Sequence, residues 1–244
     1  MIKDEIFKET ITEAADFKFG KKVAEVFDDM VNRSVPFYAE IQRMVAELAG
    51  KHAIDNTAVY DLGCSTGTSF LLMDDTIKSD SVHFTGIDDS PDMLVKCDNK
   101  LKQFHLKHSY NLEVGDLNNG VIISNASVIN LCLTLQFVRP LYREKLLKKI
   151  YDGLVPGGVL ILVEKILAED SQFNRDFVEY YYNYKRRQHY SDLEIAQKRE
   201  ALENVLIPYK LSENIAMLRE AGFAHCEVFF KWYNFSGLLA VKAT

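Results

Sequence analysis

The sequence has few cysteines, no long apolar run and no excess of basic residues. Its 244 residues include four cysteines, which are scattered with no C-x-x-C pair and no histidine at ligand spacing. This pattern predicts reduced thiols, with neither a disulfide framework nor a metal site. No run of about 18 apolar residues is present, so no membrane-spanning helix is expected.

The charge balance argues against direct binding of nucleic acid. The formal net charge is -6, because 35 acidic residues outnumber 29 basic ones. Proteins that hold nucleic acid by its phosphates need clustered lysine and arginine. The first residues, MIKDEIFKET, carry charges where a signal peptide would have its apolar segment. We therefore expect a cytoplasmic protein that binds neither nucleic acid nor membrane.

Helical and strand patterns alternate through most of the chain, which fits a single domain over residues 1–244. Apolar residues recur at helical spacing over residues 23–52, interrupted by Pro36, so two helices are expected in an N-terminal extension of about residues 1–55. Strands are predicted over residues 57–63, 82–88, 110–116, 126–137 and 159–165. Helices are predicted over residues 67–78, 90–104, 141–154 and 211–221, with Ser90 as an N-cap and Pro91 at the first helical position.

This alternation predicts a doubly wound, Rossmann-like α/β fold with helices on both faces of a mostly parallel sheet. Two further strands around the turn YNFSG, residues 233–237, would bring the sheet to seven strands and make one of them antiparallel. A long helical stretch over residues 169–206 lies outside the alternation. We expect it to form a helical arm.

Small residues follow the first predicted strand in the sequence VYDLGCSTG. Side chains without bulk let backbone amides approach a ligand. Acids also stand at the ends of the first three strands: Asp61, then Asp88 with Asp89, then Asp116. Asp88 lies 25 residues after Gly63, close to the spacing of an acid that accepts ribose hydroxyls. Acids at strand ends also cap helices, but three in register beside a glycine loop favour a nucleoside site.

The loop G-C-S-T-G resembles that of S-adenosylmethionine-dependent methyltransferases. Together with its flanks, the chain resembles more closely the carboxy-S-adenosyl-L-methionine synthase family, from about residue 20 onward. The motifs that carry the resemblance are RSVPFY, VYDLGCSTG, GIDDSPDM, NASVINLCLTLQF, YSDLEIAQKREALENV and WYNFSGLLAVK. The first and the fifth are the most specific, because they lie outside the fold that all these methyltransferases share.

The resemblance implies the class I methyltransferase fold and a reaction of S-adenosyl-L-methionine with prephenate. The products would be carboxy-S-adenosyl-L-methionine and phenylpyruvate, and the former would supply the carboxymethyl group of modified wobble uridine (cmo5U) in tRNA. A homodimer without a metal is also implied. Two alternatives stay open: a conventional small-molecule methyltransferase and a non-catalytic nucleoside-binding protein.

The resemblance also implies the site residues. Arg199, in Q-K-R, would grip the new carboxylate and act in catalysis, although from its spacing alone it is a solvated residue of an amphipathic helix. The residues expected to bind the nucleoside substrate or product are Tyr38, Gly63, Cys64, Ser65, Asp88, Asp89, Asp116, Leu117 and Arg199. Arg33, Arg139, Arg143 and the basic part of the arm are all candidates for binding prephenate.

Two positions depart from the family pattern. Cys132 stands where the family usually has asparagine, and GIDDS replaces GIDNS, which makes Asp89 charged. The arm segment FVEYYYNYKRRQHY could bind nucleic acid by charge and stacking. Because no wider basic field supports that interpretation, we favour a helix with a packed aromatic side, an exposed basic side and a subunit interface. Whether Arg199 would act in its own subunit or in the neighbouring one is left open.

Overall fold

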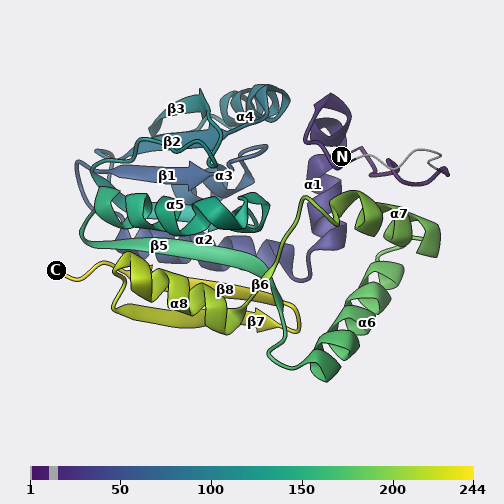
Figure 1. Ribbon diagram of the computed structural model, residues 1–244. Helices are drawn as coiled ribbons and strands as arrows, with labels where there is room; N and C mark the ends of the chain where they lie inside the picture. Colours follow the sequence, from purple (N-terminus) through teal and green to yellow (C-terminus); the bar gives the residue numbers. More distant parts are fainter. Residues whose placement is uncertain (1, 11–15) are drawn as a thin grey trace.

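A mostly parallel sheet forms the centre of the protein, in a computed structural model that describes residues 2–10 and 16–244 (Figure 1). The strands in spatial order are β3 (Ser109–Val114), β2 (His83–Asp88), β1 (Ala58–Leu62), β4 (Ala126–Cys132), β5 (Leu154–Leu167), β8 (Phe235–Val241) and β7 (His225–Trp232). β8 is antiparallel to both β5 and β7. The predicted doubly wound fold with an antiparallel C-terminal strand is confirmed. A two-residue strand, β6 (Tyr209–Lys210), pairs with β5 and was not predicted.

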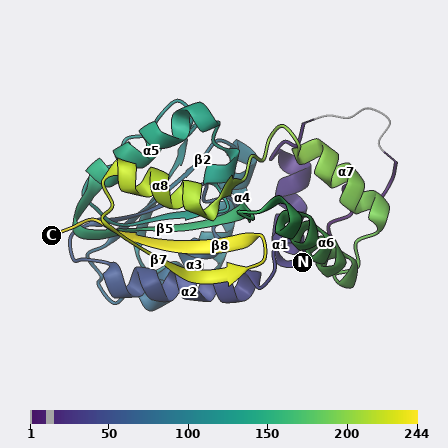
Figure 2. The same ribbon diagram turned by 60° about the horizontal axis from the view of Figure 1, so that its bottom comes forward.

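Helices cover both faces of the sheet (Figure 2). One face carries α2 (Tyr38–His52), α3 (Thr68–Thr76) and α4 (Pro91–Gln103), and the other carries α5 (Pro140–Gly153) and α8 (Leu211–Ala221). Successive residues of a strand point to opposite faces, so Val128 packs in the core under α2 and Ile129 in the core under α5. α4 begins as predicted, because Ser90 Oγ accepts the Met93 N–H at 3.2 Å with Pro91 in the first turn.

Three helices lie beyond the carboxyl ends of the strands: α1 (Lys21–Ser34), α6 (Ser171–Arg187) and α7 (Asp192–Leu202) (Figure 1). The prediction of one continuous helical stretch over residues 169–206 is wrong, because this segment forms two separate helices, α6 and α7. The chain turns after α6, where His189 has a φ of 66°, and α7 begins in a capping box of Ser191 and Glu194. The S-x-x-E pattern at this position is the signal that marks the new helix.

The strand predicted over residues 126–137 is too long. β4 ends at Cys132, and Leu135–Phe137 form a 3-10 turn whose N–H groups need acceptors. Glu164 of β5 supplies them, since its carboxylate accepts the backbone N–H groups of Thr134, Leu135 and Gln136. Conversely, β5 begins at Leu154, five residues before the predicted start at residue 159, so it includes the VPGG segment between the predicted helix and strand.

Candidate active site

A cleft of about 620 Å³ lies between the carboxyl ends of the strands and helices α1, α6 and α7. The residues that the sequence predicts for the site all line it: Tyr38, Gly63, Cys64, Ser65, Asp88, Asp89, Asp116, Leu117 and Arg199. Asp61 does not. Its carboxylate is buried beneath the loop, where Oδ1 accepts from Asn130 Nδ2 at 2.9 Å and Oδ2 has no partner among the described residues. Burial raises the pKa of Asp61 to about 7.

The glycine loop is held against the ends of two strands. The N–H groups of Gly63 and Cys64 both donate to the Ile87 carbonyl, at 2.7 and 3.1 Å. Gly63 has a φ of 79°, and a Cβ there would lie 2.5 Å from Cγ2 of Thr134. Only glycine therefore fits without displacing its neighbour. Ser65 lines the cleft at this turn, and its own N–H donates to the Asp88 carboxylate.

Asp88 and Asp89 have different surroundings. The carboxylate of Asp88 accepts the Ser65 N–H at Oδ2 and the Ser90 N–H at Oδ1, both at 2.9 Å. It therefore ties β2 to the glycine loop and to α4, and burial raises its pKa to about 6. Asp89 is exposed in the cleft, and its carboxylate accepts no hydrogen bond from another residue of the described chain. Asp89 is thus the acid available for ribose hydroxyls.

Asp116 and Leu117 also divide their roles. Asp116 accepts from the N–H and Nδ2 of Asn118 at 2.8 and 2.7 Å, and from Nδ2 of Asn119 at 2.8 Å. Its carboxylate is largely used within its own turn. The backbone N–H of Leu117 meets no acceptor within the described ranges. This N–H can donate to an adenine ring nitrogen. The glycine loop, the exposed Asp89 and the Leu117 N–H are together suited to binding a nucleoside.

The other end of the cleft is basic. Lys165 from β5, Lys185 from α6, and Lys198 and Arg199 from α7 all line it. Lys185 and Lys198 are only 6% and 7% exposed. Burial lowers the pKa of Lys165 and of Lys198 to about 8 and lowers that of Lys185 well below its usual value. The prediction of an exposed basic side on the arm helix holds for Arg186 and Arg187, but it is wrong for Lys185.

Known proteins resemble this chain along its whole length. A carboxy-S-adenosyl-L-methionine synthase of Methylococcus capsulatus is 54% identical, and the match covers 99% of this chain and all of that protein. A carboxy-S-adenosyl-L-methionine synthase of Desulfotalea psychrophila is 43% identical, and the match covers 98% of this chain and 97% of that protein. The chain belongs to the carboxy-S-adenosyl-L-methionine synthase family. It is therefore a transferase, and residues 59–158 match the methyltransferase domain model. An O-methyltransferase family protein of Burkholderia thailandensis superposes with a TM-score of 0.68 at 14% identity, over 96% of this chain and 66% of its own, which shows the shared fold.

Three hydrogen-bonded polar side chains line the cleft of this carboxy-S-adenosyl-L-methionine synthase family member. Gln42, which is 2% exposed, accepts from Ser69 Oγ at 2.9 Å and donates Nε2 to Cys132 Sγ at 3.4 Å. The cysteine that departs from the family pattern therefore accepts a hydrogen bond from α2. Sequence analysis missed Gln42 and Ser69, although a glutamine beside Ile41 on the apolar side of a helix is a usable signal. Burial also raises the pKa of Tyr38, so that its phenol stays a donor.

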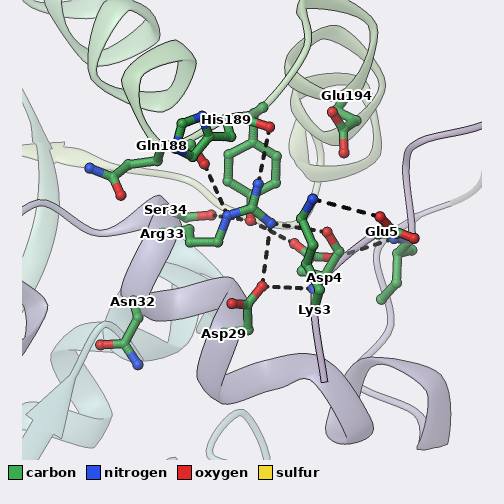
Figure 3. A network of polar contacts seen from close by, with 12 residues as sticks. Lys3, Asp4, Glu5, Asp29, Asn32, Arg33, Ser34, Gln188, His189 and Glu194 are labelled. Atoms are coloured by element: carbon green, nitrogen blue, oxygen red, sulfur yellow. Dashed lines mark hydrogen bonds and ion pairs between the residues drawn. The ribbon is translucent and has the colours of Figure 1, made fainter. Parts of the chain in front are cut away.

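Arg33 and Arg143 were candidates for binding prephenate, but neither lines the cleft. Figure 3 shows the Arg33 guanidinium between α1, the N-terminal segment and the turn after α6. It donates to the carbonyls of Gln188, His189 and Asp4 at 3.0 to 3.2 Å. Arg143, 1% exposed, donates to the carbonyls of residues 136, 138 and 207. Both hold the fold together, and Arg139 is exposed outside the cleft.

Proposed function

We propose that this protein converts S-adenosyl-L-methionine and prephenate into carboxy-S-adenosyl-L-methionine and phenylpyruvate. The observation that carries the proposal is the polarity of the cleft, with a glycine loop and a free acid at one end and four cations at the other. Prephenate brings two carboxylates, and the nucleoside product gains one. A methyltransferase with a neutral acceptor would not need four basic side chains at one end of its cleft, two of which, Lys185 and Lys198, are buried.

The nucleoside would lie across the strand ends. Asp89 would accept the ribose hydroxyls, Leu117 would donate to adenine, and the loop of Gly63, Cys64 and Ser65 would support the methionine tail. Asp88 and Asp116 would act mainly by fixing the backbone around them, as their hydrogen bonds to neighbouring residues indicate. Tyr38 would contact the nucleoside from α2.

The chemistry needs a base, carbon dioxide and a dry site. Prephenate loses carbon dioxide and its ring hydroxide as it becomes aromatic. The hydroxide takes a proton from the sulfonium methyl to form water, and the resulting carbanion bonds to carbon dioxide as the new carboxylate. The carbanion step requires that bulk water be kept from the reacting atoms. Arg199 would then hold the new carboxylate through two parallel hydrogen bonds.

We further propose that the protein is a cytoplasmic homodimer whose product serves tRNA wobble-uridine modification. Aromatic rings on α6 and the β7–β8 turn support the dimer. The ring centroids of Phe177 and Tyr180 lie 5.2 and 5.0 Å from that of Tyr233. Phe173, whose ring stacks near that of Phe177, is 59% exposed. Exposed aromatic surface of this kind suits a subunit interface. Light scattering would then give twice 27.9 kDa. No helix among the described residues is long and apolar enough to cross a membrane.

The deciding experiment is incubation of the purified protein with both substrates, followed by mass analysis of the nucleoside. Carboxy-S-adenosyl-L-methionine together with phenylpyruvate supports the proposal. S-adenosylhomocysteine formed with an added acceptor would instead indicate a conventional methyltransferase. Tight nucleoside binding with no turnover under any condition would indicate a binding protein.

A further inference from the structure

We propose that Lys165 and Lys185 bind the two carboxylates of the prephenate co-substrate, in a subsite whose floor is the ring of Tyr181. This inference rests on the proposed function and assigns its second substrate to named residues. Both ammonium groups lie near the same ring, Lys165 Nζ at 5.1 Å and Lys185 Nζ at 4.7 Å from its centroid. The ring is fixed in place, because the hydroxyl of Tyr181 donates to the Ser34 carbonyl at 2.9 Å.

Neither Lys165 nor Lys185 has an ion-pair partner among the described residues, although Asp4 is close enough to act against the lowering of the Lys185 pKa. In the part of the chain that the structure describes, no carboxylate lies within 4.0 Å of either ammonium group and no acceptor lies within hydrogen-bond distance. Lys198 differs, since its ammonium group donates to Ser34 Oγ at 3.2 Å and lies 3.8 Å from Asp4 Oδ2. Lys185 is buried and Lys165 is half-buried, and a buried lysine is normally paired. The two unpaired ones therefore face the cleft as a site for an anion with two separated charges.

The surroundings favour a carbocyclic dicarboxylate over a compact inorganic anion. Val178, Tyr182 and Phe235 also line the cleft, and the ring centroids of Tyr182 and Phe235 lie 6.4 and 5.3 Å from that of Tyr181. A six-membered carbon ring can pack against these side chains while its carboxylates reach the ammonium groups. Lys198 acts as a positioning residue, because its link to Asp4 and Ser34 fixes one side of the subsite.

The pKa shifts are consistent with an anion site. Burial, and then the nearby Lys198 and Lys165, lower the pKa of Lys185. Burial, and then Arg199, lower that of Lys165 to about 8. An anion between these groups would offset the mutual repulsion and restore their charged forms. Without an anion, the charged forms of Lys165 and Lys185 are therefore disfavoured.

The test uses the full-length protein saturated with S-adenosylhomocysteine, which lacks the reacting methyl group, so that prephenate can bind without turnover. Calorimetric titration should show that Lys185→Met and Lys165→Met weaken prephenate binding about thirtyfold or more, while the affinity for S-adenosylhomocysteine stays unchanged. The matched control is Arg187→Met, which removes an exposed charge from the same helix outside the cleft. Lys185→Met should also melt at or above the wild-type temperature, because it removes an unpaired buried charge.

The possible outcomes test the lysine subsite and the proposed reaction separately. If wild type forms the carboxylated nucleoside and both lysine variants keep its prephenate KM, the subsite is wrong and the function stands. If wild type forms no product but binds the unreactive dianion terephthalate in a Lys185-dependent way, the anion site stands and the proposed function fails. If wild type binds neither dianion, both are overturned.

Discussion

The backbone N–H of Ser65 donates to the Asp88 carboxylate at 2.9 Å, which joins the glycine loop to the end of the neighbouring strand. The second oxygen of the same carboxylate accepts the Ser90 N–H at the start of α4. One side chain thus fixes two of the segments that border the nucleoside end of the cleft. An acid at this position shapes the site as well as lining it.

Asp88→Asn should weaken S-adenosyl-L-methionine binding by about tenfold or more. Asparagine has one acceptor oxygen, so one of the two backbone N–H groups would face an amide NH2 and lose its partner, at a cost of about 1–3 kcal/mol. Isothermal titration calorimetry measures the affinity. Asp92→Asn, an exposed acid in the first turn of α4, is the control that should bind normally. Equal affinity of the Asp88 variant and wild type would show that the carboxylate does not support the site.

Gly63→Ala should destabilise the protein more than Gly157→Ala does. The two glycines have nearly the same φ, 79° and 78°, so the backbone strain is matched at about 1 kcal/mol. The new methyl group at 63 would meet Thr134 at 2.5 Å, whereas that at 157 would have its nearest neighbour at 3.6 Å. The clash should add about 1–3 kcal/mol, measured as the difference in free energy of unfolding in urea. Equal destabilisation by the two variants would contradict the close approach of Thr134.

The sequence predicted the sheet and the nucleoside end of the cleft because those features are local. Alternating patterns mark the strands, and small residues and acids follow strand ends whatever the distant parts of the chain do. Asp89 lines the cleft as expected for this reason, whereas Leu117, which also lines it, was expected only from the family resemblance. The sequence could not predict that Asp88 holds the backbone while Asp89 stays free to bind a ligand. This difference depends on which carboxylate reaches the Ser65 N–H on a distant segment.

The basic end of the cleft was largely missed because burial is a tertiary property. In YYYNYKRRQHY, Lys185 looks like its exposed neighbours Arg186 and Arg187, and only the packing of α6 across the strand ends buries it. Lys165 sits at the end of an apolar strand with no local sign of a cleft. Arg33 and Arg143 were credible anion ligands by residue type, and only the carbonyl groups around them reveal structural roles.

Arg143→Met should lower the free energy of unfolding by at least about 2 kcal/mol and leave the prephenate KM unchanged. The variant removes three donors from buried carbonyl groups, and each carbonyl left without a partner is costly. Arg143 also stacks on the Tyr209 ring, 4.3 Å from its centroid. Thermal denaturation and steady-state kinetics give the two quantities. A raised KM without a loss of stability would return Arg143 to the list of substrate ligands.

Binding of prephenate should take up protons between about pH 8 and pH 10.5. Lys165 and Lys198 have pKa values lowered from 10.5 to about 8 in the folded protein, so they are partly neutral in this range, and an anion would protonate them again. Arg199 and Lys185 lie near Lys165, and Lys185, Arg33, Asp4 and Glu194 lie near Lys198. The last two are acids, so Lys198 keeps acidic neighbours whether or not the anion is bound. Calorimetry in buffers of different ionisation enthalpy measures the uptake, and Lys165→Met should reduce it. Zero uptake in wild type at pH 9 would contradict the prediction.

The same shifts fix the sign of the pH dependence of stability. Between about pH 8 and pH 10.5 the unfolded chain holds more protons on these lysines than the folded protein does, so ligand-free stability should rise with pH across this window. Below about pH 8 both states are protonated and the burial cost is fully present. Urea unfolding of wild type and Lys165→Met at the two limits would show a smaller rise in the variant. An identical rise would mean that Lys165 keeps an ordinary pKa.

Arg199→Ala should spare the binding of S-adenosyl-L-methionine and weaken that of carboxy-S-adenosyl-L-methionine about thirtyfold. The two nucleosides differ by one carboxylate, so an effect confined to the second isolates the contact with that group. Arg199 lines the basic end of the cleft and lies close enough to Lys165 to lower its pKa, although much of its side chain is exposed. Arg199→Lys is the informative companion, since lysine keeps the charge and loses the paired hydrogen bonds, and it should restore only part of the affinity. If the alanine variant bound both nucleosides as wild type does, Arg199 would have no part in holding the product.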